Sequence, residues 1–313
     1  MTTALSTGNG MYLPDQAGDL RRIVEEKRQA SRHGGRGSHL KTMAVLSGKG
    51  GVGKSNVSLS ISCALADEGK RVVLLDADLG MANLDILCGI VAKYNLSHLV
   101  AGSRELDEIL IPLEERVLLL PGGSGLKEMA DLDDEGMERV FDLLMGLEDR
   151  ADVLVMDTGA GIHKGVLSFA QAADVALLVT TPEPTSVRDA YGVIKSLGGG
   201  GRKQGEDLML VVNMAGSRGE AHDVADRIRM ASIQFLGSAP AYLGYILRDD
   251  SVERAVRGRK IFYRSHPSSS AAKCVKRLTG ELLRLWDGRP VQADAQGIRS
   301  FFLRLTRGFF AEP

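Results

Sequence analysis

The chain has 313 residues, with 39 basic and 40 acidic side chains, and 44% of its residues are apolar. This length suits one large α/β domain or two small ones, and the balanced charge argues against a protein that coats nucleic acid with its whole surface. The three cysteines form no C-x-x-C pair, which argues against a zinc or iron–sulfur site and against a disulfide framework. No signal peptide opens the chain and no apolar run approaches the roughly 20 residues that span a bilayer, so we expect a cytoplasmic protein.

The first 32 residues are expected to form an N-terminal arm. Residues 14–32 read as a helix, because Pro14 suits the first turn, Asp15 follows it, and basic residues gather near the end. The glycine-rich residues 33–40 then read as a flexible linker.

Residues 41–286 alternate between apolar strands and helices. A helix is expected at 55–67 and a last helix at 268–286. The pattern predicts an α/β fold in which helices cover both faces of a mostly parallel, twisted sheet. A second linker is expected at 287–297, followed by a tail at 298–313. The expected strands cover residues 42–47, 71–76, 116–120, 152–157, 174–181, 207–213 and 241–246.

The sequence GKGGVGKS at 48–55 fits the eight-residue P-loop pattern and lies between a predicted strand and a predicted helix. Glycines let backbone N–H groups face phosphates, and the helix N-terminus adds positive potential. Lys54 should reach the β- and γ-phosphates, and the Ser55 hydroxyl should hold Mg²⁺. The predicted nucleotide-binding residues here are Gly48, Gly50, Gly51, Val52, Gly53, Lys54, Ser55 and Asn56.

Acidic residues follow at the ends of two predicted strands. Asp157 ends VLVMD, as expected of a carboxylate near Mg²⁺, and Asp76 and Asp78 end VVLLDAD. Strand C-termini line the ligand crevice of a parallel α/β sheet, so these groups can converge on the P-loop. The predicted Mg²⁺ ligands are Ser55, Asp78 and Asp157.

The residues that follow the strand at 207–213 help to decide whether the nucleotide carries adenine or guanine. Its continuation, VVNMAGS, lacks the lysine and aspartate of the N-K-x-D motif with which GTPases of this general type read guanine. We therefore predict ATP, with Asn213 as a candidate adenine contact; a plain strand-end cap is the alternative for this residue.

A second lysine, Lys49, precedes the usual P-loop lysine, and with it the motif resembles the deviant Walker A motif of the MinD/ParA ATPases. Residues 76–89, 157–162 and 180–195 resemble further segments of that family, which belongs to the SIMIBI class of P-loop NTPases. The resemblance implies a homodimer that sandwiches ATP, in which Lys49 reaches the partner's phosphates and Asp78 orients the attacking water. The implied catalytic residues are Lys49, Lys54, Asp78 and Asp157.

The tail suggests a membrane contact. On a helix, its apolar side chains share one face, and no acid appears before Glu312. Such a basic amphipathic helix suits an anionic membrane, as in MinD, and two copies in a dimer would bind through avidity. The alternative is docking of the tail on the protein's own surface, and the two states can alternate with ATP. The expected membrane residues are Ile298, Phe301, Phe302, Leu305 and Phe309.

The sequence DQAGDLR at 15–21 resembles a motif of the FlhG (FleN) family, MinD-like regulators of flagellar number and placement. There the motif stimulates FlhF, an SRP-type GTPase, which would place Gln16, Ala17, Leu20 and Arg21 at that partner. The resemblance also implies flagellar C-ring proteins or a flagellar transcriptional activator as partners, and the inner face of the cytoplasmic membrane as the site of attachment.

Two other members of the same superfamily and one unrelated enzyme class remain as alternatives. A division-site MinD would leave the N-terminal arm without a role. A ParA-type DNA-partitioning ATPase is supported by the basic stretch at 254–267 and by Lys273, Lys276 and Arg277 nearby, although a solvated basic face is the commoner meaning of such a run. A metabolic P-loop kinase would leave Lys49 without a role.

Overall fold

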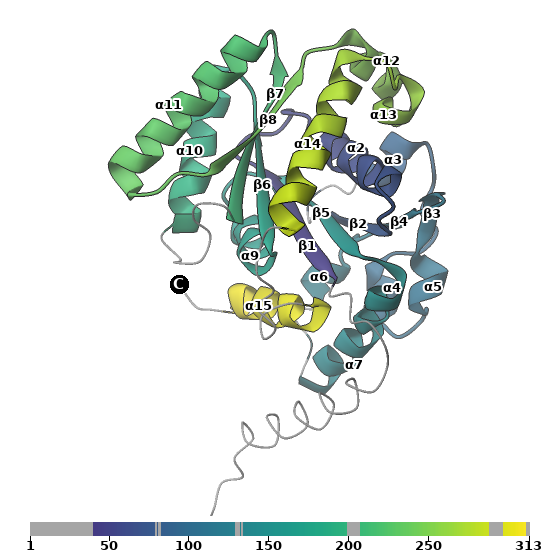
Figure 1. Cartoon of the computed structure of the whole chain (residues 1–313). Helices are drawn as coiled ribbons and strands as arrows, with labels where there is room; N and C mark the ends of the chain where they lie inside the picture. Colours follow the sequence, from purple (N-terminus) through teal and green to yellow (C-terminus); the bar gives the residue numbers. More distant parts are fainter. Residues whose placement is uncertain are drawn as a thin grey trace, which may run out of the picture. The chain divides into compact units, whose positions relative to one another are not determined.

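A computed structural model describes residues 40–78, 80, 83–128, 132, 134–198, 207–287 and 297–310. Its centre is an eight-stranded sheet in the order β3-β4-β2-β5-β1-β6-β7-β8 (Figure 1). Every neighbouring pair is parallel except β3 and β4. The strands are β1 Lys41–Ser47, β2 Val72–Ala77, β3 Ile111–Glu114, β4 Val117–Leu120, β5 Val153–Ala160, β6 Val175–Thr180, β7 Leu208–Ala215 and β8 Ala241–Leu247.

The predicted α/β class is confirmed, and each expected strand is present. The sequence reading missed one strand, β3, which pairs with β4 at the edge of the sheet through the turn at 115–116. β3 is only four residues long and contains Pro112, which cannot donate a ladder hydrogen bond, so it lacks the usual strand signature.

Helices cover both faces of the sheet (Figure 1). The described helices are α2 Lys54–Asp67, α3 Leu84–Cys88, α4 Leu96–Val100, α5 Leu106–Ile109, α6 Gly125–Glu128, α7 Asp134–Met145, α8 Leu147–Arg150, α9 Lys164–Ala172, α10 Pro184–Gly198, α11 Arg218–Leu236, α12 Asp250–Arg257, α13 Phe262–Ser265, α14 Ser270–Asp287 and α15 Ile298–Phe310.

Alternate side chains of each central strand enter different cores. In β1, Met43 and Val45 pack with α2, α13 and α14 on one face of the sheet. Ala44 packs on the other face with α7, α9 and α15, and Leu46 packs there with α9, α10 and α11. Burial on both faces explains why the central strands read as continuous apolar runs.

The C-terminal tail is a helix, α15, but its apolar face is buried against α7 and α9. The Phe301 ring stacks on Phe169 at a centroid distance of 6.4 Å, and Phe302 packs on Phe141 at 5.9 Å. The side chains of Ile298, Phe301, Phe302 and Leu305 are at most 3% exposed. The structure therefore shows the docked arrangement of α15, and the membrane contact of these residues stays a prediction.

Polar contacts complete this interface. The Arg304 guanidinium donates to the Ala172 carbonyl over 2.8 Å and pairs with Asp174 at 3.5 Å. At the start of α15, the Ile298 N–H donates to Glu148 Oε1 over 2.9 Å. Buried aromatic rings and these hydrogen bonds make α15 part of the domain's core.

Some predictions lie outside the described residues. These are the N-terminal arm with Gln16, Ala17, Leu20 and Arg21, and the two linkers apart from their end residues. The same holds for the side chain of Phe309. In the part of the chain that is described, no helix is long and apolar enough to cross a membrane.

The three cysteines are free thiols, as expected. Cys63 and Cys274 are buried and Cys88 is half-buried. Burial raises the pKa of the Cys88 thiol to about 12, and it also raises the pKa of Cys63. Both therefore remain protonated near neutral pH, which suits a packing role.

Candidate nucleotide site

The P-loop joins the C-terminal end of β1 to the first turn of α2. Gly51 and Gly53 take left-handed φ angles of 79° and 85°, which a residue with a side chain adopts only with strain. Gly53 is also the N-cap of α2, and no side chain caps the helix there. The free N–H groups of the first turn are therefore open to an anion.

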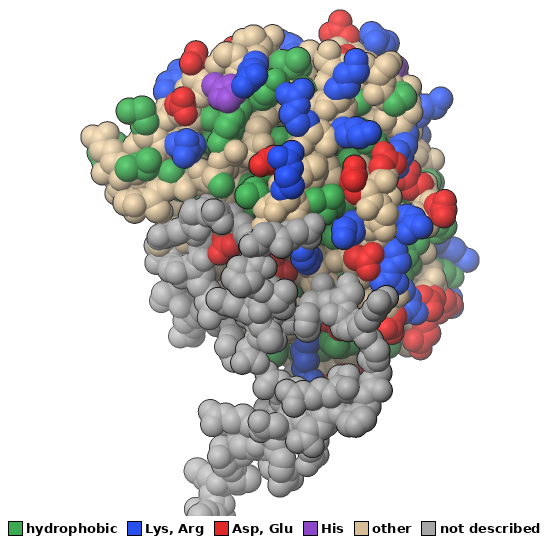
Figure 2. Space-filling view, viewed as in Figure 1, with side chains coloured by type: hydrophobic (Ala, Val, Ile, Leu, Met, Phe, Trp, Pro, Cys, Tyr) green, Lys and Arg blue, Asp and Glu red, His purple; other side chains and the backbone are tan. Residues whose placement is uncertain are grey.

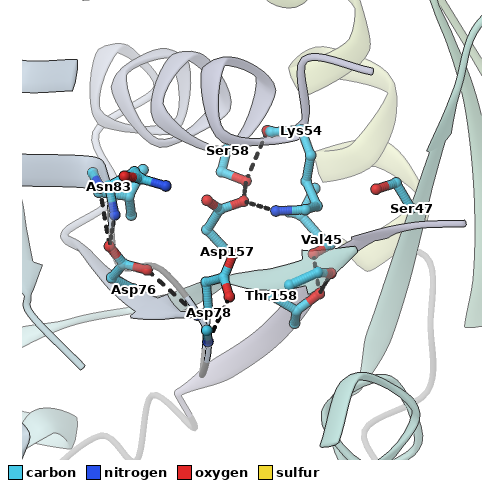
Figure 3. A network of polar contacts seen from close by, with 12 residues as sticks. Val45, Ser47, Lys54, Ser58, Asp76, Asp78, Asn83, Asp157 and Thr158 are labelled. Carbon is cyan, nitrogen blue, oxygen red and sulfur yellow. Dashed lines mark hydrogen bonds and ion pairs between the residues drawn. The ribbon is translucent and has the colours of Figure 1, made fainter. Parts of the chain in front are cut away.

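The P-loop lysine, Lys54, lies inside the site rather than in solvent. Its Nζ is 3.1 Å from Asp157 Oδ1, and the side chains of both residues are more than nine-tenths buried (Figure 3). Ser58, one turn further along α2, places its hydroxyl 2.9 Å from the same carboxylate oxygen. The sequence reading missed Ser58, although its i+4 spacing from Lys54 puts both side chains on one face of α2.

Asp76 and Asp78 lie beside Asp157 because β2 and β5 are neighbours. In the parallel register, Asp76 pairs with Asp157. A Cβ added at Gly159, two residues after Asp157, would lie 3.3 Å from Asp78 Oδ1. The predicted convergence of the three carboxylates on the P-loop is therefore what the strand order produces (Figure 3).

The Asp76 carboxylate holds the segment that follows β2. It accepts the backbone N–H of Asn83 over 2.9 Å and that of Leu84 over 3.0 Å. Burial raises the pKa of Asp76 to about 6, with a further contribution from Asp157, while these backbone donors act in the opposite direction. Asp76 thus links the carboxylate cluster to the start of α3.

The second lysine, Lys49, does not join this cluster. Its Nζ is 2.7 Å from Glu183 Oε2 and 3.0 Å from Thr185 Oγ1, at the start of α10. The side chain of Lys49 is 38% exposed and that of Glu183 is 66% exposed. The hydrogen bond and charge of Lys49 hold the pKa of Glu183 below its usual value. The sequence reading quoted this segment but gave no role to Glu183 or Thr185.

The loop is braced by its neighbours. Asn213, at the end of β7, is 7% exposed and donates its side-chain N–H to the Val52 carbonyl over 2.8 Å. A Cβ at Gly48 would lie 2.4 Å from the Asp189 carbonyl oxygen, so α10 rests directly on the loop. Asn213 therefore positions the P-loop, and its predicted contact with adenine stays a prediction.

The donor set fits a magnesium nucleotide. Mg²⁺ in phosphate sites takes one or two protein oxygens, with water and phosphate oxygens completing its shell. Ser55 is in the first turn of α2, and Asp157 already converges on the same turn through Lys54. Among the described residues, no group of three or more His, Cys, Asp or Glu could hold a metal by itself. Ser55 and Asp157 would leave the other positions of the Mg²⁺ shell to phosphate oxygens and water.

The comparisons with known proteins agree with this geometry. Residues 43–261 match the family described as the CobQ/CobB/MinD/ParA nucleotide binding domain, CbiA. The chain belongs to this family. The MinD/ParA resemblance read from the P-loop is confirmed, and so is the prediction of an ATPase.

Three relatives of this MinD/ParA ATPase are informative. The antiactivator FleN of Pseudomonas aeruginosa is 38% identical over 265 residues, which are 84% of this chain and 92% of FleN. The flagellum site-determining protein YlxH of Helicobacter pylori is 32% identical over 295 residues, or 94% of this chain and 98% of YlxH. The crystal structure of the cell division ATPase MinD of Pyrococcus furiosus gives a TM-score of 0.61 at 25% identity, covering 78% of this chain and 99% of MinD.

Proposed function

We propose that this ATPase is an ATP-dependent dimerisation switch that regulates flagellar number or placement. The flagellar role is supported by the names of FleN and YlxH, which this chain matches over most of its length. ATP and Mg²⁺ are the proposed ligands of the P-loop cradle. Mg²⁺ would offset phosphate charge, while Lys54 and the backbone N–H groups of α2 bind and orient the phosphates.

The observation that carries the switch is the position of Lys49. Lys54 is buried with Asp157, whereas Lys49 extends to the exposed Glu183, outside that cluster. A half-exposed ammonium beside the nucleotide cradle is available to a second copy of the chain. In the proposed dimer, each Lys49 exchanges Glu183 for the partner's phosphates and stabilises the charge that develops during hydrolysis.

Mixing two inactive variants tests the arrangement. Lys49→Ala should remove the lysine that acts in trans, and Asp78→Ala should remove the group that orients water in its own subunit. Each variant alone should bind ATP but hydrolyse it at least roughly a hundredfold more slowly than the unmodified chain. A mixed dimer would contain one complete site, because the Lys49→Ala subunit keeps Asp78 and receives the partner's lysine.

Recovery of phosphate release on mixing is therefore the expected result. A mixture that stays as inactive as its components would contradict action in trans, provided that co-purification of differently tagged subunits shows mixed dimers. Full turnover by Lys49→Ala alone would contradict any catalytic role of this lysine.

The docked tail is proposed to reach the membrane when ATP drives dimerisation. Its buried face is aromatic, and residues 298–310 contain three arginines and no acidic residue, which is the composition that membrane-surface helices use. An engineered disulfide between α15 and α9 can test this. A Cβ at Gly308 would lie 3.1 Å from the Ser168 Cβ, a few tenths of an ångström below the Cβ–Cβ distances found in disulfides.

The variant Ser168→Cys/Gly308→Cys should bind anionic vesicles with ATP only after reduction, because oxidation locks α15 in its groove. Gly308→Cys alone is the control and should ignore the oxidant. Equal vesicle binding by the oxidised and reduced double variant would show that α15 is not the membrane anchor.

The partner GTPase is proposed to meet the N-terminal arm. Gln16→Ala in the full chain should abolish stimulation of an FlhF-type GTPase, while Gln29→Ala, in the same arm, should leave it intact. Stimulation that survives Gln16→Ala would contradict the role of this residue, and no stimulation by the unmodified chain would remove the basis for this partner. The antiactivator and site-determining roles named for the relatives support a transcriptional activator or the C-ring as the downstream partner.

A further inference from the structure

Basic residues are concentrated in the last part of the domain. Residues 241–287 contain ten basic and five acidic residues, whereas the whole chain has 39 and 40. This segment includes β8, α12, α13 and α14. A protein that is almost neutral overall therefore carries a strongly positive region in this part of its domain, where a polyanionic partner could bind.

The charges form a line along α14. One side of this helix is buried in the core by Val275, Leu278 and Leu282, among others. The opposite side carries four exposed cations at helical spacing, and Figure 2 shows Lys and Arg side chains along the course that α14 follows in Figure 1. We call these four residues the basic stripe: Lys273, Lys276, Arg277 and Arg284.

Most of the stripe is not neutralised within the molecule. Arg284 pairs with Glu281 at 3.1 Å. Arg277 donates to the Tyr245 hydroxyl over 3.3 Å and lies over its ring, so its positive charge is retained. Within the described residues, no ion pair involves Lys273, Lys276 or Arg277. These charges are therefore available to an external anion.

The segment between α14 and α15 limits how far the tail can move from the basic stripe. α14 ends at Asp287 and α15 begins at Ile298, so the residues between them can span at most roughly 36 Å. α14 itself is about 27 Å long by its 18 residues. A tail that leaves its groove and binds a membrane therefore stays within roughly 36 Å of the end of α14, so the tether allows the basic stripe to reach the same surface.

We propose that the basic stripe lies against anionic lipid headgroups when the tail is bound to the membrane. This inference rests on the proposed membrane attachment, and it assigns a second contact and an orientation to it. One short amphipathic anchor binds only marginally, and a basic patch is the second signal that makes such attachment stable. Nucleic acid offers the same charge, but the tether to the tail favours lipid.

Vesicle binding by the full chain with ATP tests the stripe. The variant Lys273→Glu/Lys276→Glu reverses two exposed charges. It should weaken binding to phosphatidylcholine vesicles that contain phosphatidylglycerol by roughly tenfold or more. Binding to pure phosphatidylcholine vesicles should not change. The matched control is Lys195→Glu/Arg227→Glu, two exposed positions on α10 and α11 with the same change in net charge. It should lose less than about twofold.

Three outcomes would overturn the proposal. Equal losses of vesicle binding in the two double variants would show that net charge alone, and not the position of the stripe, causes the effect. Unchanged vesicle binding by Lys273→Glu/Lys276→Glu would remove the lipid contact. Loss of binding to random duplex DNA with vesicle binding intact would assign the stripe to nucleic acid. Melting temperatures of both variants check that the fold is retained.

The oxidised Ser168→Cys/Gly308→Cys protein separates this proposal from the one on which it rests. If locking α15 removes vesicle binding while Lys273→Glu/Lys276→Glu does not, the tail is the anchor and the stripe proposal fails. If the locked protein still binds phosphatidylglycerol vesicles and the stripe variant does not, the stripe binds lipid and the tail proposal fails.

Discussion

Two regions of the molecule are largely buried but are held together by different interactions. One is the carboxyl edge of the sheet with Lys54 and Asp157, here called the nucleotide edge, and the other is the groove between α7 and α9 that holds α15. At the nucleotide edge, α2 and β5 hold charged groups within contact distance, as in the ion pair between Lys54 and Asp157. In the α15 groove, aromatic rings such as Phe301 and Phe302 are packed, and Arg304 donates to the Ala172 carbonyl. The first region is arranged for an incoming ligand, and the second is complete without one.

Removing Lys54 should have the largest effect on the nucleotide edge. Lys54→Ala should lower kcat/KM for ATP by about a thousandfold, because it removes the cation nearest the phosphates. It should also destabilise the nucleotide-free protein by about 3 kcal/mol, since buried Asp157 loses its charged partner. Lys54→Arg is the control that keeps the charge. An Ala variant as stable as the original chain would show that Asp157 does not depend on Lys54.

Truncating one ring should give the largest effect in the α15 groove. Phe301→Ala should lower the free energy of unfolding by about 3–4 kcal/mol, because the ring is fully buried against Phe169. Leu303→Ala, on the exposed side of the same helix, should cost less than about 1 kcal/mol. Denaturant titrations measure both. Similar small costs would mean that α15 is attached only loosely, and the contrast between the two regions would fail.

The nucleotide edge should also show a pH signature. The folded protein binds the Asp76 proton more tightly than the unfolded chain does, so this residue lowers stability as pH rises from about 4 to about 6. Relative to Asp76→Asn, the original chain should lose on the order of 3 kcal/mol across that window and nothing further above it. Parallel unfolding curves at several pH values check this. A constant difference between the two proteins would show an ordinary pKa at Asp76.

The smallest effect concerns the polar edge of the groove. Arg304→Ala should cost about 1–2 kcal/mol, because its guanidinium is mostly buried between the Ala172 carbonyl and Asp174. Arg139→Ala, which breaks an exposed pair with Glu135, should cost less than about 0.5 kcal/mol. Denaturant midpoints distinguish them. Equal costs would show that the apolar contacts alone hold the helix.

Sequence reasoning worked best where chemistry and topology impose the residues. The P-loop glycines and Asp157 were predicted because strand ends in a parallel sheet converge, and the structure places Asp76, Asp78 and Asp157 together. The alternation of apolar strands and helices likewise gave the fold. These features depend on spacing along the chain, which a sequence shows directly.

It worked less well where tertiary packing decides between outcomes. The prediction that α15 is a helix with one apolar face was correct. The sequence pattern of an amphipathic helix is, however, the same whether its apolar face contacts lipid or a groove of the protein. Only the positions of Phe141 and Phe169 decide for the groove. The contact of Lys49 with Glu183 was missed for the same reason, because 134 residues separate the pair.

The docking of α15 has a practical consequence for work with the gene. A chain that stops before residue 298 would leave the rings of Phe141 and Phe169 facing water, in a groove that the helix normally fills. Exposed apolar surface of this kind promotes aggregation. A shortened protein would then aggregate or be degraded. In a cell, that loss of folded protein would look the same as a loss of membrane targeting.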